Sequence, residues 1–292
     1  ISQQLGPKNG LPPYVAVPNT FPSYGAGYLG GAHNPFIAGD PNATGYQVRD
    51  LTLPVDVDWA RVDNRRFLVQ QMDARFRSVE ASPDFAALDE FSKKAYDLLS
   101  SPTAKKAFDV QSEPAALRER YGRTPFGQGC LLARRLVERG APLVTVNWER
   151  DDAYWDTHAK NFIDLKGKLC PNLDQGFSTL LDDLKQRGLL DDTLIVWLGE
   201  FGRTPQINAN AGRDHWAACN TVLLAGAGIA GGAVYGSSDR LAAYPASNAV
   251  TPDDLAATVY HLLGIDREQT LYDPLRRPWP LCQGEPVWDI IG

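Results

Sequence analysis

The sequence predicts an α/β fold with a mostly parallel sheet, helices on both faces and a helical insertion. Apolar runs with strand character occupy residues 141–148, 193–199 and 220–226, as is typical of strands that are covered on both faces. A long pattern of helical spacing at 159–187 separates the first run from the second. Strand, helix and strand in this order imply a right-handed crossover between parallel strands.

Two segments precede this sheet core, and we expect all 292 residues, 1–292, to form one domain. Residues 1–57 are rich in Gly, Pro, Asn and aromatic residues, which predicts loops packed against the body with one short strand in YVAVP. Residues 58–140 predict a helical segment before the sheet core at 141–292. Its helical patterns cover 61–79, 83–99 and 125–140.

Helix boundaries follow from capping residues. Thr124 precedes a Pro at the first helical position, and Thr251 precedes another, so each is expected to cap a helix. The pattern at 159–187 ends before Gly188, a usual helix terminator. Pro171 should kink or split this helix, because proline lacks an N–H donor and its ring clashes with the preceding turn.

The charge of the chain and the length of its apolar runs argue against a nucleic-acid partner and against a membrane span. The formal net charge is −6 and the isoelectric point is about 5.3, which argues against nucleic acid because such proteins usually present a basic face. No apolar run approaches the roughly 20 residues that a membrane span needs. The chain begins with Ile1, so we expect a trimmed protein or a fragment.

Asp156 and His158 follow the apolar run at 141–148 in a polar loop. In an extended Asp-x-His segment both side chains project to the same side, so that they can hold one cation. A carboxylate with a neutral imidazole suits zinc, manganese or iron. The alternative is a loop carboxylate that bonds to backbone groups beside a merely amphipathic histidine.

A second group of polar side chains follows the run at 193–199. It contains Glu200 and the pair Asp214 and His215. Bringing three carboxylates and two of the four histidines together is unfavourable unless a cation or protons neutralise them. The sequence therefore predicts a metal site drawn from Asp156, His158, Glu200, Asp214 and His215. Alternatively, Glu200 or Asp214 forms an ion pair with a neighbouring arginine.

Arg203 and Arg213 are the candidates for binding the anionic group of a substrate, because guanidinium forks match phosphate and sulfate oxygens. Structural salt bridges are the alternative for both. A GxGxxG pattern at 226–231 follows an apolar run, but the residues after it read as strand and turn rather than as a helix. We interpret it as a glycine-rich turn and not as a dinucleotide site.

Several segments together resemble the domain-of-unknown-function family 1501 (DUF1501), which is similar to the alkaline phosphatase and sulfatase superfamily. They are WDTHAKNF, DDTLIVWLGEFGRTPQINANAGRDHW, LLAGAGIAGGAVYGSSD and VTPDDLAATVYHLLGID. The resemblance implies a hydrolase of phosphate or sulfate esters with one or two divalent metals (zinc, manganese, iron or calcium). It implies that Asp156, His158 and His215 hold the first metal, that the substrate is an anionic ester such as a sulfated or phosphorylated glycan, and that the protein is exported to the periplasm or beyond.

The chain departs from the superfamily pattern at two places. Where the second metal takes an Asp-His pair, this chain has Glu200 and Phe201, and a phenylalanine cannot bind a metal. The family's first strand, and a nucleophile in the matching position, do not precede Ile1. A hydrolase that is inactive as this fragment is therefore one reading. A non-catalytic protein that binds a glycan or a protein through the aromatic loops of 11–45 is the alternative.

Overall fold

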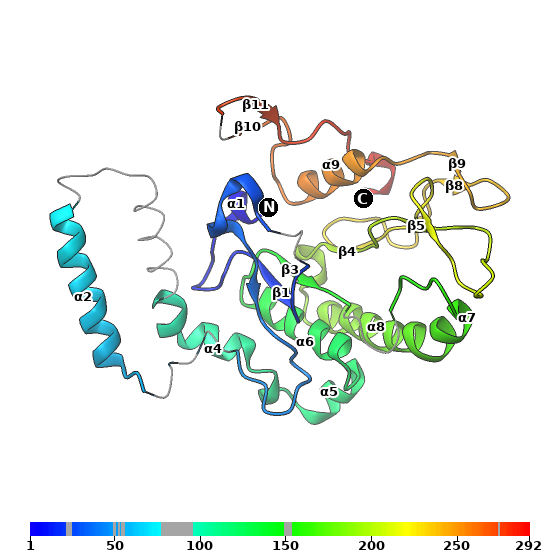
Figure 1. Ribbon diagram of the computed structural model, residues 1–292. Helices are drawn as coiled ribbons and strands as arrows, with labels where there is room; N and C mark the ends of the chain where they lie inside the picture. Colours follow the sequence, from blue (N-terminus) through cyan, green and yellow to red (C-terminus); the bar gives the residue numbers. More distant parts are fainter. Residues whose placement is uncertain are drawn as a thin grey trace.

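The computed structural model describes residues 1–21, 25–48, 51, 53, 56–76, 96–148, 154–273 and 275–292. These residues form a mixed helix and strand fold that contains a small parallel sheet, which confirms the α/β class in its general form (Figure 1). The sequence analysis expected more: one mostly parallel sheet. The described strands instead form one three-stranded parallel sheet and four two-stranded antiparallel pairs.

The parallel sheet has the order β2-β1-β3. Its central strand β1 (Val15–Val17) pairs with β2 (Phe36–Ile37) on one side and β3 (Val144–Val146) on the other. All three residues of β1 are fully buried, as a strand of β-branched and small apolar residues should be at the centre of a sheet. The loop-rich segment 1–57 therefore contributes two of the three strands, which its composition did not predict beyond the strand in YVAVP.

Helix α6 (Pro125–Glu138) joins the sheet to the rest of the body. Its Leu132 and Leu136 pack in one buried cluster with Val15 and Val17 of β1. The opposite side of α6 supplies Cys130 and Leu131 to a second cluster, with leucines of α8 (Cys170–Gln186). Figure 1 shows α6 beneath β1 and β3, with α8 packed beside α6. Thr124 caps α6, because its hydroxyl accepts a hydrogen bond from the backbone N–H of Gly127 at 3.1 Å.

Residues 58–140, where the sequence analysis expected a helical segment, are largely helical where the structure describes them. They contain α2 (Trp59–Phe76), α4 (Pro102–Phe108), α5 (Ala115–Tyr121) and α6. Of the helix expected at 83–99, residues 83–95 lie outside the described residues, and 96–100 are helical. Residues 77–79 of the first expected helix also lie outside them.

The helix expected at 159–187 is present, but it is not split at Pro171, because residues 161–186 are helical without interruption. A short helix α7 (Asn161–Asp164) is followed by a π-helical turn at Leu165–Leu169, and α8 begins at Cys170 with Pro171 in its first turn. The irregularity before the proline is thus a change from α-helical to π-helical hydrogen bonding, and the helix continues through it. The backbone after α8 turns at Gly188, which has a φ of 67°.

Strand β4 (Ile195–Trp197) pairs with β7 (Leu223–Ala225) in antiparallel orientation. The expected parallel pairing is wrong here, because the connection from 198 to 222 contains no crossover helix and two strands joined without one can pair antiparallel. That connection instead forms the small hairpin of β5 (Gly202–Arg203) and β6 (His215–Trp216). The glycine-rich stretch at 226–231 forms a turn, and no helix follows it directly.

The C-terminal part adds helix α9 (Pro252–Leu262), which begins with a capping box between Thr251 and Asp254. The other short α-helix and strands among the described residues are α1 (Ser2–Leu5), β8 (Ser237–Ser238), β9 (Pro245–Ser247), β10 (Thr270–Tyr272) and β11 (Pro278–Pro280). Among the helices in the described ranges, none has both the length and the apolar character that a bilayer span requires.

Candidate metal centre

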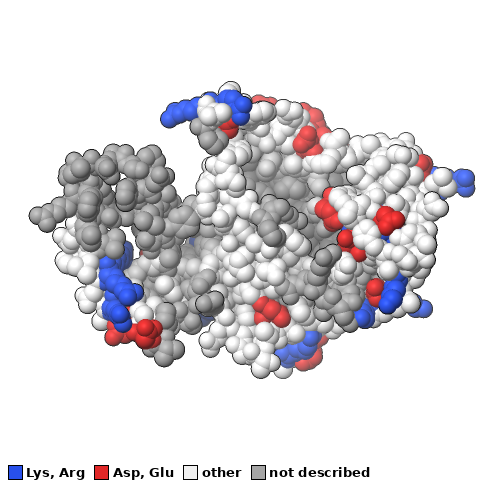
Figure 2. Space-filling view, viewed as in Figure 1, with Lys and Arg blue, Asp and Glu red and all other residues white. Residues whose placement is uncertain are grey.

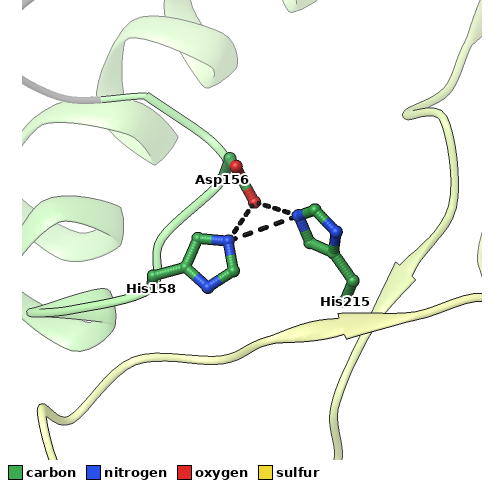
Figure 3. Close-up of side chains that lie close together, drawn as sticks. All are labelled: Asp156, His158 and His215. Carbon is green, nitrogen blue, oxygen red and sulfur yellow. Dashed lines mark hydrogen bonds and ion pairs between the residues drawn. The ribbon is translucent and has the colours of Figure 1, made fainter.

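Two segments meet at the candidate site. One is the loop that follows β3, which carries Asp156 and His158, and the other is the β5–β6 hairpin, which carries His215 on β6. Figure 3 shows that the three side chains point toward one another from these two segments. The sequence analysis expected this meeting of two polar loops, and the structure confirms it for Asp156, His158 and His215.

One carboxylate oxygen and two imidazole nitrogens converge at the centre of the site. Asp156 Oδ1 lies 3.0 Å from Nε2 of His158 and 3.0 Å from Nε2 of His215. The two Nε2 atoms are 3.3 Å apart, and the three side chains offer donor atoms that all lie within 4.8 Å of one another. Such a set of one oxygen and two nitrogen donors can hold a divalent metal. About half of each imidazole is exposed, so the centre opens to solvent.

The aromatic residue before Asp156 anchors its loop. The ring of Trp155 lies 5.4 Å from that of Trp148, just after β3, and 6.3 Å from that of Trp197 in β4. Both contacts are edge-to-face, the geometry that aromatic pairs prefer. The loop that carries Asp156 is therefore packed between the ends of two strands.

Backbone hydrogen bonds join the two segments of the site. The N–H of Arg213 donates to the carbonyl of Thr157 at 2.9 Å, and the N–H of Asn161 donates to the carbonyl of Ala211 at 2.9 Å. Gly212 lies so close to the other segment that a Cβ atom at this position would be 2.0 Å from the carbonyl carbon of His158. Only glycine permits this approach, and the two segments are thereby held together by the fold itself.

Asp214 lies beside the centre rather than in it. Its Oδ1 is 2.9 Å from Nδ1 of His158, the ring nitrogen that faces away from Asp156. Asn208, which the sequence analysis did not single out, donates a hydrogen bond from its Nδ2 to the same carboxylate oxygen at 3.1 Å. The signal that would have found Asn208 is its place in a Gly/Asn-rich loop directly before Asp214.

Arg203 and Glu200 lie on the other side of Asp156. Nη2 of Arg203 is 3.1 Å from Asp156 Oδ1 and 2.8 Å from Oε1 of Glu200, so the guanidinium bridges the two carboxylates. The ion pair of Glu200 with an arginine, one of the alternatives raised by the sequence, is thus present. Among the described residues the buried Nε of Arg203 has no hydrogen-bond partner. Figure 2 shows acidic side chains gathered over this part of the surface.

The other predicted site arginine has a different setting. Nη1 of Arg213 donates to the carbonyl oxygens of Thr204 and Pro205, at 2.6 and 2.9 Å. These bonds hold the two ends of the loop between β5 and β6 together. Phe201 packs edge-on against the His215 ring at 4.7 Å between centroids. The Arg203 guanidinium lies 5.3 Å from the centre of the Phe201 ring.

Asp156 and Asp214 are stabilised in their charged form. Partial burial raises the pKa of Asp156, but the hydrogen bond from His215 and the charge of Arg203 outweigh it, and the pKa lies below its usual value. Hydrogen bonds from His158 and then from Asn208 lower the pKa of Asp214. Both groups therefore carry a negative charge at neutral pH, as metal ligands and their supporting carboxylates must.

Comparison with known proteins gives a family but no activity. No curated protein matches the chain, and no solved structure matches it. A family model described as "Protein of unknown function (DUF1501)" matches residues 1–291. The motifs that form the centre described above lie within this match. The chain belongs to the DUF1501 family.

Proposed function

We propose that this protein is a metal-dependent hydrolase of phosphate or sulfate esters. The observation that supports it most is the convergence of Asp156 Oδ1 with the two Nε2 atoms of His158 and His215 within 4.8 Å. Imidazole nitrogens and a carboxylate oxygen favour zinc, manganese or iron, whereas calcium prefers oxygen ligands alone. We propose one metal per chain, because Phe201 cannot bind a second.

The residues around the centre have distinct tasks in this proposal. A divalent cation held by Asp156, His158 and His215 would polarise the ester and activate the attacking group. Asp214 orients the His158 ring through its Nδ1. Nη2 of Arg203 lies 3.1 Å from Oδ1 of Asp156, so its positive charge is next to the centre and would stabilise an oxyanion of the substrate.

Arg213 has a weaker case as an anion-binding residue. Its Nη1 bonds to two loop carbonyls, which indicates that it holds the loop on which Asp214 lies. Glu200 balances the charge of Arg203. We therefore assign the contact with substrate to Arg203 and the support of the loop to Arg213 and Glu200.

An alkaline-phosphatase-like fold, an anionic ester substrate and export from the cytoplasm belong to the same proposal. A parallel sheet backed by α6 and α8, with acids and histidines in the loops after β3 and β4, supports an alkaline-phosphatase-like arrangement. The resemblance of the sequence motifs to that superfamily supports an anionic ester as substrate, such as a sulfated or phosphorylated glycan, and export from the cytoplasm.

One observation favours a second candidate, a non-catalytic binding protein on the same fold. Phe201 packs against His215 where a hydrolase with two metals would need a ligand. In that case the centre would hold a structural metal, and the aromatic loops of residues 11–45 would bind a glycan or a protein.

Ester turnover distinguishes the two candidates. The purified protein is stripped of metal, reloaded with zinc, manganese or iron, and assayed with an aryl phosphate and an aryl sulfate. The hydrolase proposal predicts turnover that needs metal and is lost in the His158→Ala, His215→Ala double variant. His261→Ala on α9 is the matched control and should keep the activity, because the His261 ring packs on Trp288 and is not part of the group of donor atoms at the centre. Metal binding without turnover of either ester would favour the binding protein.

A further inference from the structure

Asn208 uses every hydrogen-bonding atom of its side chain. Its Nδ2 donates to the carbonyl oxygen of His158 at 3.0 Å and to Oδ1 of Asp214 at 3.1 Å. Its Oδ1 accepts from the backbone N–H groups of Asn210 and Gly212, both at 2.9 Å. One side chain thus contacts both segments of the site and the loop between them.

An amide is the chemical group that this position requires. The Asn208 side chain must accept two bonds from the loop and donate two bonds across it, and only a primary amide has both abilities on one short stem. An aspartate at this position would have no proton to donate to Asp214, and an alanine would make none of the four bonds.

The bond from Asn208 to Asp214 has a consequence for His158. A histidine that binds a metal through Nε2 carries its proton on Nδ1, and Oδ1 of Asp214, 2.9 Å from Nδ1 of His158, is placed to accept a hydrogen bond from it. Nε2 of the same ring faces Asp156 and His215. The contact that Asn208 supports therefore favours the tautomer of His158 that can bind a metal at the centre.

We propose that Asn208 is a positioning residue of the metal centre. By holding Asp214 and the His158 backbone at once, it keeps the His158 ring in the orientation and tautomer that present Nε2 to a divalent cation. This role rests on one part of the proposed function, the binding of a metal at the centre, and does not require that the protein hydrolyses an ester. It assigns to Asn208 no contact with the metal or with the substrate.

The test compares metal affinity in four proteins. Zinc binding is measured by calorimetry, with chelator competition, in the wild type, Asn208→Ala, Asn208→Ser and Asn210→Ala. Groups that support metal ligands typically change metal affinity by about 10- to 100-fold, and a loss of this size is expected for Asn208→Ala. Asn210→Ala is the matched control in the same loop. Asn210 contributes only backbone atoms to these hydrogen bonds, so the zinc affinity of Asn210→Ala should stay within about twofold of the wild type.

Asn208→Ser separates positioning from loop folding. A serine hydroxyl can still accept from the loop N–H groups, although more weakly, but it is too short to reach Asp214. We expect Asn208→Ser to lose zinc affinity while its melting temperature stays the same. This result supports the positioning role of Asn208 even if Asn208→Ala does not fold. Wild-type affinity in Asn208→Ser would overturn the proposal.

A double-mutant cycle with Asp214→Ala adds a second criterion. If Asn208 acts through Asp214 and His158, then Asn208→Ala should weaken zinc binding in the Asp214→Ala background by less than about threefold, because interacting residues are not additive. Fully additive losses would contradict an effect that passes through Asp214.

The tautomer is measured directly in the metal-free protein by ¹⁵N chemical shifts of the histidine rings. The wild type should show His158 protonated on Nδ1, and Asn208→Ala should show a mixture of tautomers. This measurement keeps the two proposals apart. If the wild type binds no zinc but the tautomer depends on Asn208, the proposed function fails and the positioning of His158 stands. If zinc binds and neither affinity nor tautomer changes in Asn208→Ala, only the role of Asn208 is refuted.

Discussion

Nδ1 of His158 lies 2.9 Å from Oδ1 of Asp214, while Nε2 of the same ring lies 3.0 Å from Oδ1 of Asp156. The imidazole is therefore held between two carboxylates, one inside the candidate centre and one beside it. A histidine ligand whose second nitrogen donates to a carboxylate is the usual arrangement in metal sites. Asp214 should act on the metal through His158 rather than by contact.

Asp214→Asn is the variant that tests this relationship. An amide at this position can turn its NH₂ toward Nδ1, which would favour the tautomer with the proton on Nε2 and would block metal binding there. Zinc affinity should fall about 10- to 100-fold, as measured by chelator competition. Asp182→Asn, at an exposed position on α8, is the control and should bind as the wild type does. An unchanged affinity in Asp214→Asn would show that His158 needs no support from this carboxylate.

Gly212 should be irreplaceable for steric reasons. A Cβ at Gly212 would lie 2.0 Å from the carbonyl carbon of His158, so Gly212→Ala must push the two segments of the site apart. Overpacking of this kind costs roughly 1–3 kcal/mol of unfolding free energy. Thermal melting should report it, together with weaker zinc binding. Gly231→Ala is the matched control, since a Cβ at Gly231 meets open space. If both variants melt alike, the close approach at Gly212 does not exist in solution.

Arg203 should matter for anion binding and not for metal binding. Arg203→Met removes a positive charge 3.1 Å from Asp156, so zinc affinity should stay the same or increase. Binding of inorganic phosphate to the zinc-loaded protein should fall about tenfold or more, because a charge-assisted bond is lost. Both affinities are measurable by calorimetry. Arg240→Met, at an exposed position between β8 and β9, provides the control. Phosphate binding that survives in Arg203→Met would assign the anion to another group.

The ion pairs of Glu113 with Arg134 and Arg135 of α6 should account for part of the loss of folding stability in acid. The side chain of Arg134 is fully buried, and its Nη2 is 2.9 Å from Oε1 of Glu113. Glu113→Gln leaves a buried charge with one partner fewer, and unfolding free energy should fall by about 3 kcal/mol in denaturant titrations. Glu119→Gln, in an exposed pair with Arg123, should change it by less than about 1 kcal/mol.

The pH dependence of this effect has a defined sign. Burial raises the pKa of Glu113, but the charges and hydrogen bonds of Arg134 and Arg135 outweigh it, and the folded pKa lies below the usual value. The contribution of Glu113 is thus fully present above the unfolded pKa of about 4.3 and is lost as the pH falls through the lowered folded value. Wild type and Glu113→Gln should therefore converge in stability in acid. A difference that stays constant down to pH 2 would contradict the lowered pKa.

Elements with local determinants were predictable from the sequence. Thr124 and Thr251 cap α6 and α9 because a cap needs only its own first turn. An irregularity near Pro171 was also predictable, but it takes the form of a π-helical turn at Leu165–Leu169 and not of a break. Asp156, His158 and His215 were predictable as a group because they follow apolar strands, and the ends of strands meet in α/β folds. The family resemblance covered the same segments.

Elements with distant determinants were not predictable in this way. The central position of β1 depends on β3, which lies far away in the sequence, so composition alone made the first 57 residues look like loops. The antiparallel pairing of β4 with β7 depends on the absence of a helix in the segment between them, which the strand patterns do not record. The Gly/Asn-rich loop before Asp214 does not by itself single out Asn208, because the role of this residue depends on partners on two separate segments.

The most direct test of the central claim is the metal content of the purified protein, measured by plasma mass spectrometry beside the His158→Ala, His215→Ala double variant. We predict about one equivalent of a divalent metal in the wild type and none in the folded double variant. The His261→Ala control should keep its metal. Equal metal content in wild type and double variant, or no metal in the wild type after reconstitution with zinc, manganese and iron, would contradict a metal centre at Asp156, His158 and His215.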